Sequence, residues 1–135
     1  MNNNRRPMPV DEEEMLTRFI FYSKWYRSSD GSIKPLAFMP KPETNDTSVF
    51  RHSGFTDPDS DLSRIGEEGA RKRCCNYHGR ADIKAEYVYQ QGLGIEPTET
   101  PEHHANIVGW PQDKNKRLII ATQLAANSVS CLKNL

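Results

Sequence analysis

The segment that decides the fold runs from Pro101 to Pro111 and reads PEHHANIVGWP. Proline lacks a backbone N–H and disfavours helical geometry in the residue before it, so the two prolines exclude a long helix between them. The inner run His104–Val108 ends in β-branched residues, which fit a pleated and half-buried surface. We therefore predict a short strand over residues 104–108.

This strand divides into an apolar face and a polar face, because alternate residues of a strand point to the same side. Ala105 and Ile107 share one side with the preceding His103, and His104 and Asn106 share the other. Side chains two residues apart along a strand lie roughly 6–7 Å from each other, which suits two groups that hold one ligand. His104 is therefore a candidate general acid or base, and Asn106 a candidate ligand-binding residue. A structural histidine at the strand end is the alternative interpretation.

The composition indicates one globular domain. The chain has 135 residues, and 18 Lys and Arg side chains balance 18 Asp and Glu side chains. A net charge of zero gives no global reason to expect nucleic acid or an anionic membrane as partner, although local basic patches are compatible with it. No apolar run approaches the roughly 20 residues that span a bilayer, and the N-terminus has no secretory signal. We expect no membrane partner.

The three cysteines, Cys74, Cys75 and Cys131, include an adjacent pair and do not fit a disulfide framework. Cysteines without such a framework are typical of a reducing compartment, so we expect a cytoplasmic protein. The sequence carries no signal for an oligomeric state.

Residues 1–14 are polar and predict a flexible N-terminal tail, followed by a single α+β domain over 15–135. Aromatic and β-branched residues over 16–22 and 47–52 predict strands. The proline-containing run 33–40 predicts an edge strand or an irregular extended segment.

Helix signals begin at Thr56 and end at the basic run 71–73, with Gly66 and Gly69 expected to make this helix poor or broken. A brief strand over 81–83, a short helix over 84–91 stopped by Gly92, and a last helix beginning at 112–115 complete the chain. Together these elements predict an α+β fold, a small mixed β-sheet with two to three helices packed on one side. Apolar residues at helical spacing are expected to form the core-facing stripe of the last helix: Leu118, Ala121, Ala125, Val129 and Leu132.

Two further segments combine cations, an imidazole and glycine, namely Arg51–Gly54 and Tyr77–Arg80. Arginine holds phosphate with two parallel hydrogen bonds, and glycine lets the backbone approach a ligand closely. Arg51 and Arg80 are therefore candidate ligand-binding residues, and His52 and His78 join His104 as catalytic candidates. The basic run 71–73 could also contact phosphates, although a solvated helix end is the plainer interpretation.

Cys75, His78 and His103 are of the right chemical types to bind zinc, but their spacing is not that of a zinc finger. The chain has neither a Walker loop nor a dinucleotide-binding fingerprint, and no Gly-x-Ser-x-Gly elbow accompanies Ser53. We therefore expect no metal and no cofactor, and these three residues are only weak metal candidates.

The run Tyr77–Arg80, followed by Gly92-Leu93 and Pro97, resembles segments of ADP-ribosyltransferases. Those enzymes have an aromatic-His-Gly strand, then a helix that ends in Gly-Leu and a proline. The likeness covers about twenty residues and does not include the family's catalytic glutamate. It implies a nucleotide-binding or transferase activity.

Short motifs also lie in order along residues 16–130: LTR at 16–18, DG at 30–31 with AF at 37–38, TSVFR at 47–51, GL at 92–93 and HANIVG at 104–109. This layout resembles a loose group of short bacterial proteins of unknown function, often encoded beside toxin, phage or defence genes. The resemblance implies a bacterial accessory role and brings no established activity.

We therefore expect a small cytoplasmic bacterial accessory or binding protein that acts through a protein or nucleic-acid partner, with a protein the favoured partner. The alternative is an enzyme or nucleotide-binding protein, ADP-ribosyltransferase-like or metal-dependent, that uses a His/Arg pocket. The alternative requires the segments 51–54, 77–80 and 103–106 to converge on one concave pocket. A binding protein would scatter or satisfy them locally and expose an apolar patch elsewhere, for which Trp25 and Tyr26 are candidates.

Overall fold

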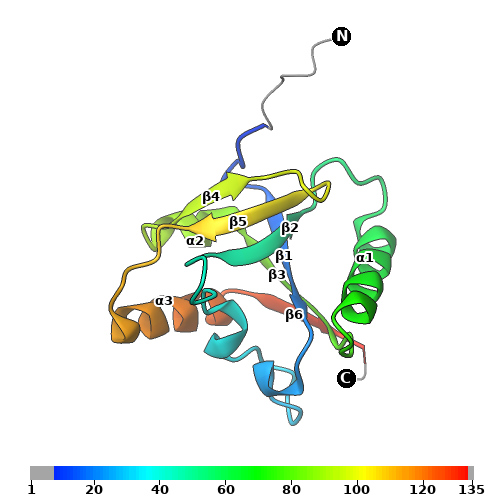
Figure 1. The fold of residues 1–135 in the computed structure, drawn as a ribbon, viewed down its shortest axis with the longest axis horizontal. Coiled ribbons are helices and arrows are strands. Elements are labelled where there is room, and N and C mark those ends of the chain that lie inside the picture. The colour runs from blue at the N-terminus through cyan, green and yellow to red at the C-terminus, as the bar shows by residue number, and fades with distance from the viewer. Residues whose placement is uncertain (1–7, 134–135) are drawn as a thin grey trace.

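The computed structural model of the chain describes residues 8–133. Within this range six strands form one sheet in the order β4-β5-β2-β1-β3-β6 (Figure 1). The strands are β1 (Met15–Ile20), β2 (Thr47–Arg51), β3 (Gly79–Lys84), β4 (Gly94–Pro97), β5 (His104–Val108) and β6 (Val129–Leu132). The helices are α1 (Pro58–Lys72), α2 (Ala85–Gln90) and α3 (Lys114–Ala126), with short 3-10 turns η1 (Ser23–Trp25) and η2 (Pro35–Phe38).

The predicted α+β class is confirmed, and all neighbouring strands of the sheet are antiparallel rather than mixed. Parallel neighbours need a crossover connection, usually a helix. Here α1, α2 and α3 each cross between two strands that run parallel but are not neighbours, and strands antiparallel to their own neighbours fill the positions between them.

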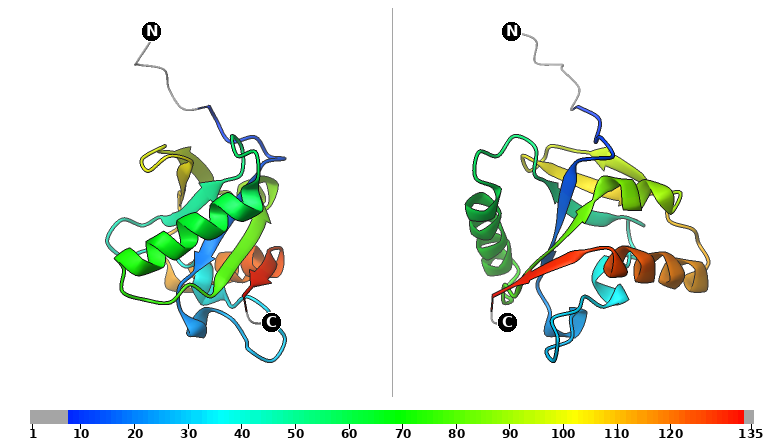
Figure 2. Two further views of the ribbon diagram at one scale, coloured as in Figure 1. Left: turned by 90° about the vertical axis from the view of Figure 1, so that its right-hand side faces the viewer. Right: turned by 180° about the vertical axis from the view of Figure 1, so that it is seen from behind.

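Helices lie on both faces of the sheet, whereas the sequence suggested one. Strand β1 is apolar on both sides: Leu16 and Ile20 enter the main core, which also includes residues of α2 and α3. Phe19 enters a second cluster beneath α1, together with Leu62 of that helix. Figure 2 shows α1 on one side of the strands and α3 on the other. A strand with two apolar faces needs a cover on each, which is the physical reason for the difference.

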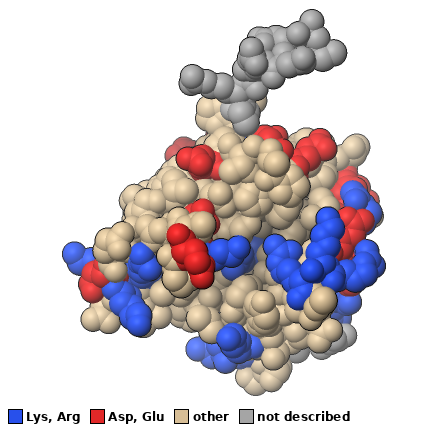
Figure 3. All heavy atoms as spheres, in the orientation of Figure 1, with Lys and Arg blue, Asp and Glu red and all other residues tan. Residues whose placement is uncertain are grey.

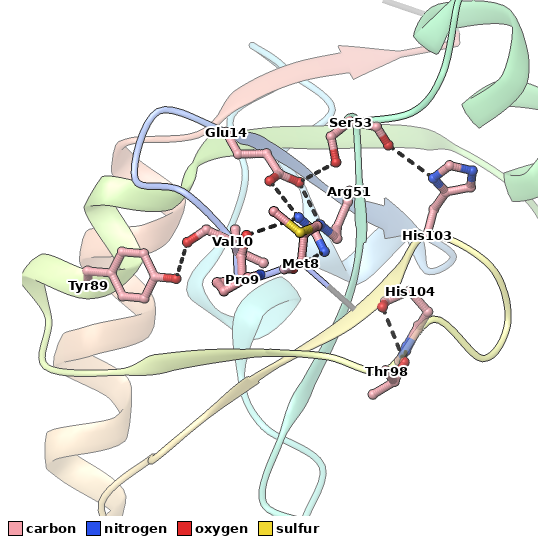
Figure 4. Close-up of polar contacts among 10 residues, drawn as sticks. All are labelled: Met8, Pro9, Val10, Glu14, Arg51, Ser53, Tyr89, Thr98, His103 and His104. Carbon is pink, nitrogen blue, oxygen red and sulfur yellow. Dashed lines mark hydrogen bonds and ion pairs between the residues drawn. The ribbon is translucent and has the colours of Figure 1, made fainter. Parts of the chain in front are cut away.

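The N-terminal segment from residue 8 onward packs against the domain, although residues 1–14 were expected to form a flexible tail. Val10 is buried, and the hydroxyl of Tyr89 donates to its carbonyl oxygen at 2.6 Å. The guanidinium of Arg51 donates to the carbonyl oxygens of Met8 and Pro9 (Figure 4). Residues 1–7 of the expected tail lie outside the described residues.

The central strand has the predicted bounds, His104–Val108, with Ala105 and Ile107 fully buried on its core side. The run after residue 33 is not extended, since Pro35 begins the 3-10 turn η2. Helix α1 continues through Gly66 and Gly69 without a break, contrary to expectation. Gly66 has a packing role, because the ring of Tyr77 occupies the place that a Cβ atom would take.

The last helix is shorter than its apolar pattern predicted. It ends at Ala126, and the side chain of Ser128 donates to the carbonyl of Ala125 at 2.8 Å. Val129 therefore belongs to edge strand β6 and is 64% exposed, while Leu118 is 50% exposed on α3. The predicted core stripe holds only at Ala121 and Ala125.

None of the helices between residues 8 and 133 has both the length and the apolar character needed to cross a lipid bilayer.

Candidate functional site

Two of the predicted site residues meet in a buried polar group that we call the Asp82 cluster: Thr17, His52, Arg80 and Asp82. Register pairing places Thr17 of β1 opposite Asp82 of β3, and the Thr17 hydroxyl donates to Asp82 Oδ1 at 2.6 Å. His52 follows directly after β2, and its Nε2 lies 2.6 Å from the same Thr17 hydroxyl. Arg80 Nε donates to both carboxylate oxygens of Asp82, at 3.1 and 3.2 Å.

The charge of Asp82 is well compensated. Burial opposes ionisation of this carboxyl, but the bonds to His52 and Thr17 and the charge of Arg80 outweigh it and lower its pKa. Arg80 also pairs with Asp59 in the first turn of α1. Thr17 is fully buried, so its hydroxyl cannot reach a substrate that arrives from solvent. The cluster ties β1, β2, β3 and α1 together.

Arg51 lies apart from this cluster, on the opposite face of the sheet. Its Nε donates to Glu14 Oε2 at 2.7 Å and its Nη2 to Glu14 Oε1 at 2.9 Å, a bidentate pair (Figure 4). The bonds to the Met8 and Pro9 carbonyls use further donors of the same guanidinium. This ligand-binding candidate is thus occupied in holding the N-terminal segment.

His104 is held between two hydroxyl groups. Its Nδ1 lies 2.6 Å from Thr98 Oγ1, and its Nε2 lies 2.5 Å from Ser48 Oγ. Burial of the ring lowers its pKa, and the charges of Lys41 and Arg73 act in the same direction against that of Asp46. These contacts favour a neutral imidazole that orders strand β5. Asn106 lies on the same face, opposite Ser48 in the register.

His103 is not part of strand β5, because its φ of 70° places it in a turn. Its ring stacks on Phe55 with centroids 3.9 Å apart, and its Nδ1 lies 3.1 Å from the Ser53 carbonyl oxygen. Gly54 provides the space, since a Cβ atom there would lie 2.8 Å from His103 Cε1. The segment 51–54 and His103 therefore do meet, but they pack against each other and do not line a pocket.

His78 and Cys75 line a shallow surface pocket of about 350 Å³ at the C-terminal end of α1. His78 Nδ1 lies 3.3 Å from the hydroxyl of Tyr26, which comes from the segment after β1. His103 is stacked on Phe55 rather than placed in this pocket, so the three metal candidates are not assembled. Across residues 8–133 no three His, Cys, Asp or Glu side chains are grouped so that they could hold a metal ion.

A different group of side chains brings cations and aromatic rings together at the surface. We define the cation–aromatic surface as Arg18, Tyr22, Lys24, Trp25 and Arg73. The Arg18 guanidinium lies 4.8 Å from the Trp25 ring centroid, and the Lys24 ammonium 5.8 Å from that of Tyr22. The two rings meet edge to face at 4.8 Å. Tyr22 is 43% exposed, and Lys24 and Arg73 are also exposed.

Arg73 joins this surface from the end of α1. Its guanidinium lies 4.9 Å from the ring centroid of Phe21, the residue directly before Tyr22. Burial and the nearby positive charge of Arg73 lower the pKa of Arg18 to about 10. Figure 3 shows, in the orientation of Figure 1, Lys and Arg side chains grouped over α1 and toward the lower edge of the molecule.

Sequence reasoning identified parts of this surface separately. Trp25 was a candidate for an exposed patch and the run 71–73 a candidate for phosphate contacts. The usable signal is the run FYSKWYR at 21–27, in which aromatic residues alternate with cations. The contact between Phe21 and Arg73 joins residues far apart in the chain, so local sequence could not reveal it.

Comparison of the chain with family models, with curated proteins and with solved structures finds no match. Function is therefore inferred from the residues and their geometry alone.

Proposed function

We propose that this protein is a small binding protein that acts by contact with a macromolecular partner through the cation–aromatic surface. One observation carries the proposal. Arg18, Lys24 and Arg73 lie over aromatic rings, and within residues 8–133 none of the three has a carboxylate within ion-pair distance. A cytoplasmic bacterial setting, near phage, toxin or defence functions, belongs to the same proposal.

Unpaired cations create a positive local potential even in a chain whose net charge is zero. In the described part of the chain, other exposed cations, such as Lys72 and Lys116, also have no carboxylate within ion-pair distance, but they do not lie over an aromatic ring. Lys133 lies over the ring of Tyr77 but is paired with Glu67. An exposed cation next to an aromatic ring and without a carboxylate partner is therefore the feature that sets Lys24 and Arg73 apart, and it suits contact with an anionic partner.

The state of the catalytic candidates supports binding over catalysis. Both ring nitrogens of His104 contact hydroxyl groups, and Arg51 and Arg80 are committed to carboxylates. A catalytic residue needs a reacting group within hydrogen-bond reach, and these side chains already have internal partners.

Affinity capture from bacterial extract tests the proposal. The immobilised full chain is compared with the double variant Lys24→Glu and Arg73→Glu, and with Lys116→Glu on α3, an exposed cation distant from this surface in the sequence. We expect the wild type and Lys116→Glu to retain the same partner and the double variant to lose it. Equal capture by all three proteins, or no specific capture, would contradict the proposal.

A second candidate function is supported by the Asp82 cluster. His52 contacts Thr17, which donates to Asp82, so an Asp–Thr–His relay of hydrogen bonds leads toward the partly exposed imidazole. Such a relay orients a general base. Assays with generic ester and phosphodiester substrates would reveal an activity that His52→Gln abolishes, and the binding proposal predicts none.

A further inference from the structure

We infer that the partner of the cation–aromatic surface is a single-stranded nucleic acid. This inference rests on the proposed function and names the partner class. Single strands are bound without sequence preference by aromatic side chains that stack on bases, together with cations that contact the phosphates between them.

The aromatic part of the surface presents an exposed ring. Tyr22 is 43% exposed, and its neighbour Trp25 meets it edge to face at an interplanar angle of 70°. Trp25 is in turn held by the Arg18 guanidinium, whose Nε donates to the Ala37 carbonyl oxygen at 2.7 Å. The Tyr22 ring is therefore supported by an ordered neighbour while remaining open to a base.

The cationic part flanks the rings. The Lys24 ammonium lies over the ring of Tyr22, and Arg73 comes from the end of α1 to lie over Phe21, the residue before Tyr22. Both cations are exposed. A phosphate backbone passing along these side chains would meet Lys24 and Arg73, with Arg18 adding a third positive charge from a more sheltered position.

A single strand fits these features better than a duplex, because the base faces of a duplex are stacked on one another and cannot reach Tyr22. An acidic protein partner would satisfy the cations but has no comparable use for the exposed ring. Binding to an acidic polypeptide or to an anionic vesicle is therefore an outcome that the experiment must separate.

Fluorescence anisotropy of the full chain provides the test. Two probes are nucleic acids: a labelled single strand of about 12 nucleotides, and a labelled hairpin whose duplex stem contains the same sequence. The other two probes are polyglutamate and phosphatidylserine vesicles. We expect binding of the single strand, weaker binding of the duplex, and a slope of log affinity against log salt of about −2, which corresponds to about three phosphate contacts.

Matched variants distinguish stacking from charge. We expect Tyr22→Ala to weaken single-strand binding roughly 5- to 100-fold, and Tyr22→Phe, which keeps the ring, to bind as the wild type does. Arg73→Gln should reduce the magnitude of the salt slope by about 0.7, whereas Lys116→Gln on α3 should leave it unchanged. Thermal unfolding of each variant confirms that the fold is retained.

Equal affinity for single strand and duplex, or an unchanged affinity in Tyr22→Ala, would overturn the inference. Exclusive binding to polyglutamate or vesicles would also overturn it while leaving the proposed function intact. If no probe binds and affinity capture also fails, both are wrong.

Discussion

The imidazole of His104 lies between the hydroxyl groups of Ser48 and Thr98, and its ring meets Phe50 edge to face at 5.4 Å. A histidine next to a second histidine suggested acid–base chemistry in the sequence. Both ring nitrogens, which would carry the proton in catalysis, instead contact hydroxyl groups. His104 therefore connects strand β5 to Ser48 of β2 and to Thr98 in the loop before β5.

We predict that His104 titrates below its ordinary pKa of 6.5, because burial disfavours the charged ring. As the pH falls below 6.5, the unfolded chain binds this proton more readily than the folded chain, so the residue makes stability rise with pH in that range. NMR titration of the ring Cε1–H measures the pKa directly. A value at or above 6.5 would contradict the assignment of a neutral, buried ring.

At Asp82 the lowered pKa also makes stability rise with pH, but in a more acidic range. The folded-state pKa lies below 3.8, so the ionised carboxylate stabilises the fold above that pH and the contribution is lost as the pH falls through the folded value. We expect Asp82→Asn to cost about 2–3 kcal/mol in the free energy of unfolding at neutral pH, because bonds to charged Arg80 weaken.

The cost should shrink when unfolding is measured below pH 3.8. The control is Asp61→Asn, whose partner Arg64 is 59% exposed, and for which the change should not exceed about 1 kcal/mol. Equal changes in the free energy of unfolding for the two substitutions would show that the Asp82 cluster stabilises the fold no more than a surface ion pair does.

Helix α1 contains Gly66 and Gly69, which serve different purposes although both lower helix propensity. A Cβ atom at position 66 would overlap the buried ring of Tyr77. At position 69 a Cβ atom would lie 3.2 Å from Arg73 Nη1 and 3.3 Å from Phe21 Cζ. The guanidinium of Arg73 is at the end of a flexible side chain and can shift to make room.

We therefore expect Gly66→Ala to destabilise the protein by about 1–3 kcal/mol, because overpacking outweighs the gain in helix propensity. Gly69→Ala should be near neutral or stabilising by up to about 1 kcal/mol. Urea unfolding of both variants gives the comparison. If Gly66→Ala proved the more stable of the two, the close packing of α1 on Tyr77 would be wrong.

Arg51 makes several of the side-chain hydrogen bonds that hold the N-terminal segment against the domain. Arg51 holds Glu14 and the carbonyls of Met8 and Pro9, and the amides of Ala85 and Glu86 bond to the same segment at 2.8 Å.

We expect Arg51→Lys, which keeps the charge but loses the guanidinium fork, to speed hydrogen exchange at the amides of Ala85 and Glu86. The cause is the loss of charge-assisted bonds worth about 1.5–3 kcal/mol each. Unchanged exchange at these two amides, with the α3 amides as the internal reference, would show that Arg51 does not hold the segment.

Most elements could be predicted from local pattern, because strand β5, helix α1 and helix α2 carry periodicity or end signals within their own residues. The end of α3 could not. Val129 continues the apolar spacing of the helix, yet Ser128 bonds to Ala125 and turns the chain into strand β6. The antiparallel sheet order also depends on pairings between distant segments, which local spacing does not encode.

At the scale of the whole molecule, the side chains with candidate chemistry were recognised but their neighbours were not. His52 and Arg80 do meet, through Asp82, because β2 and β3 both flank β1. The cation–aromatic surface arises from the end of β1 and the end of α1, and only the packing of the helix on the sheet brings Arg73 to Phe21.

The central claim is that a partner is bound at this surface, and chemical-shift mapping tests it most directly. Two-dimensional ¹H–¹⁵N spectra of the full chain are recorded while an unlabelled single-stranded oligonucleotide is added. We predict that the perturbed amides cluster at residues 18–26 and 69–74, with the Trp25 indole N–H among the shifted signals. Perturbations confined to the pocket at 75–78 and 133 or to α3, or spectra that do not change, would contradict the account.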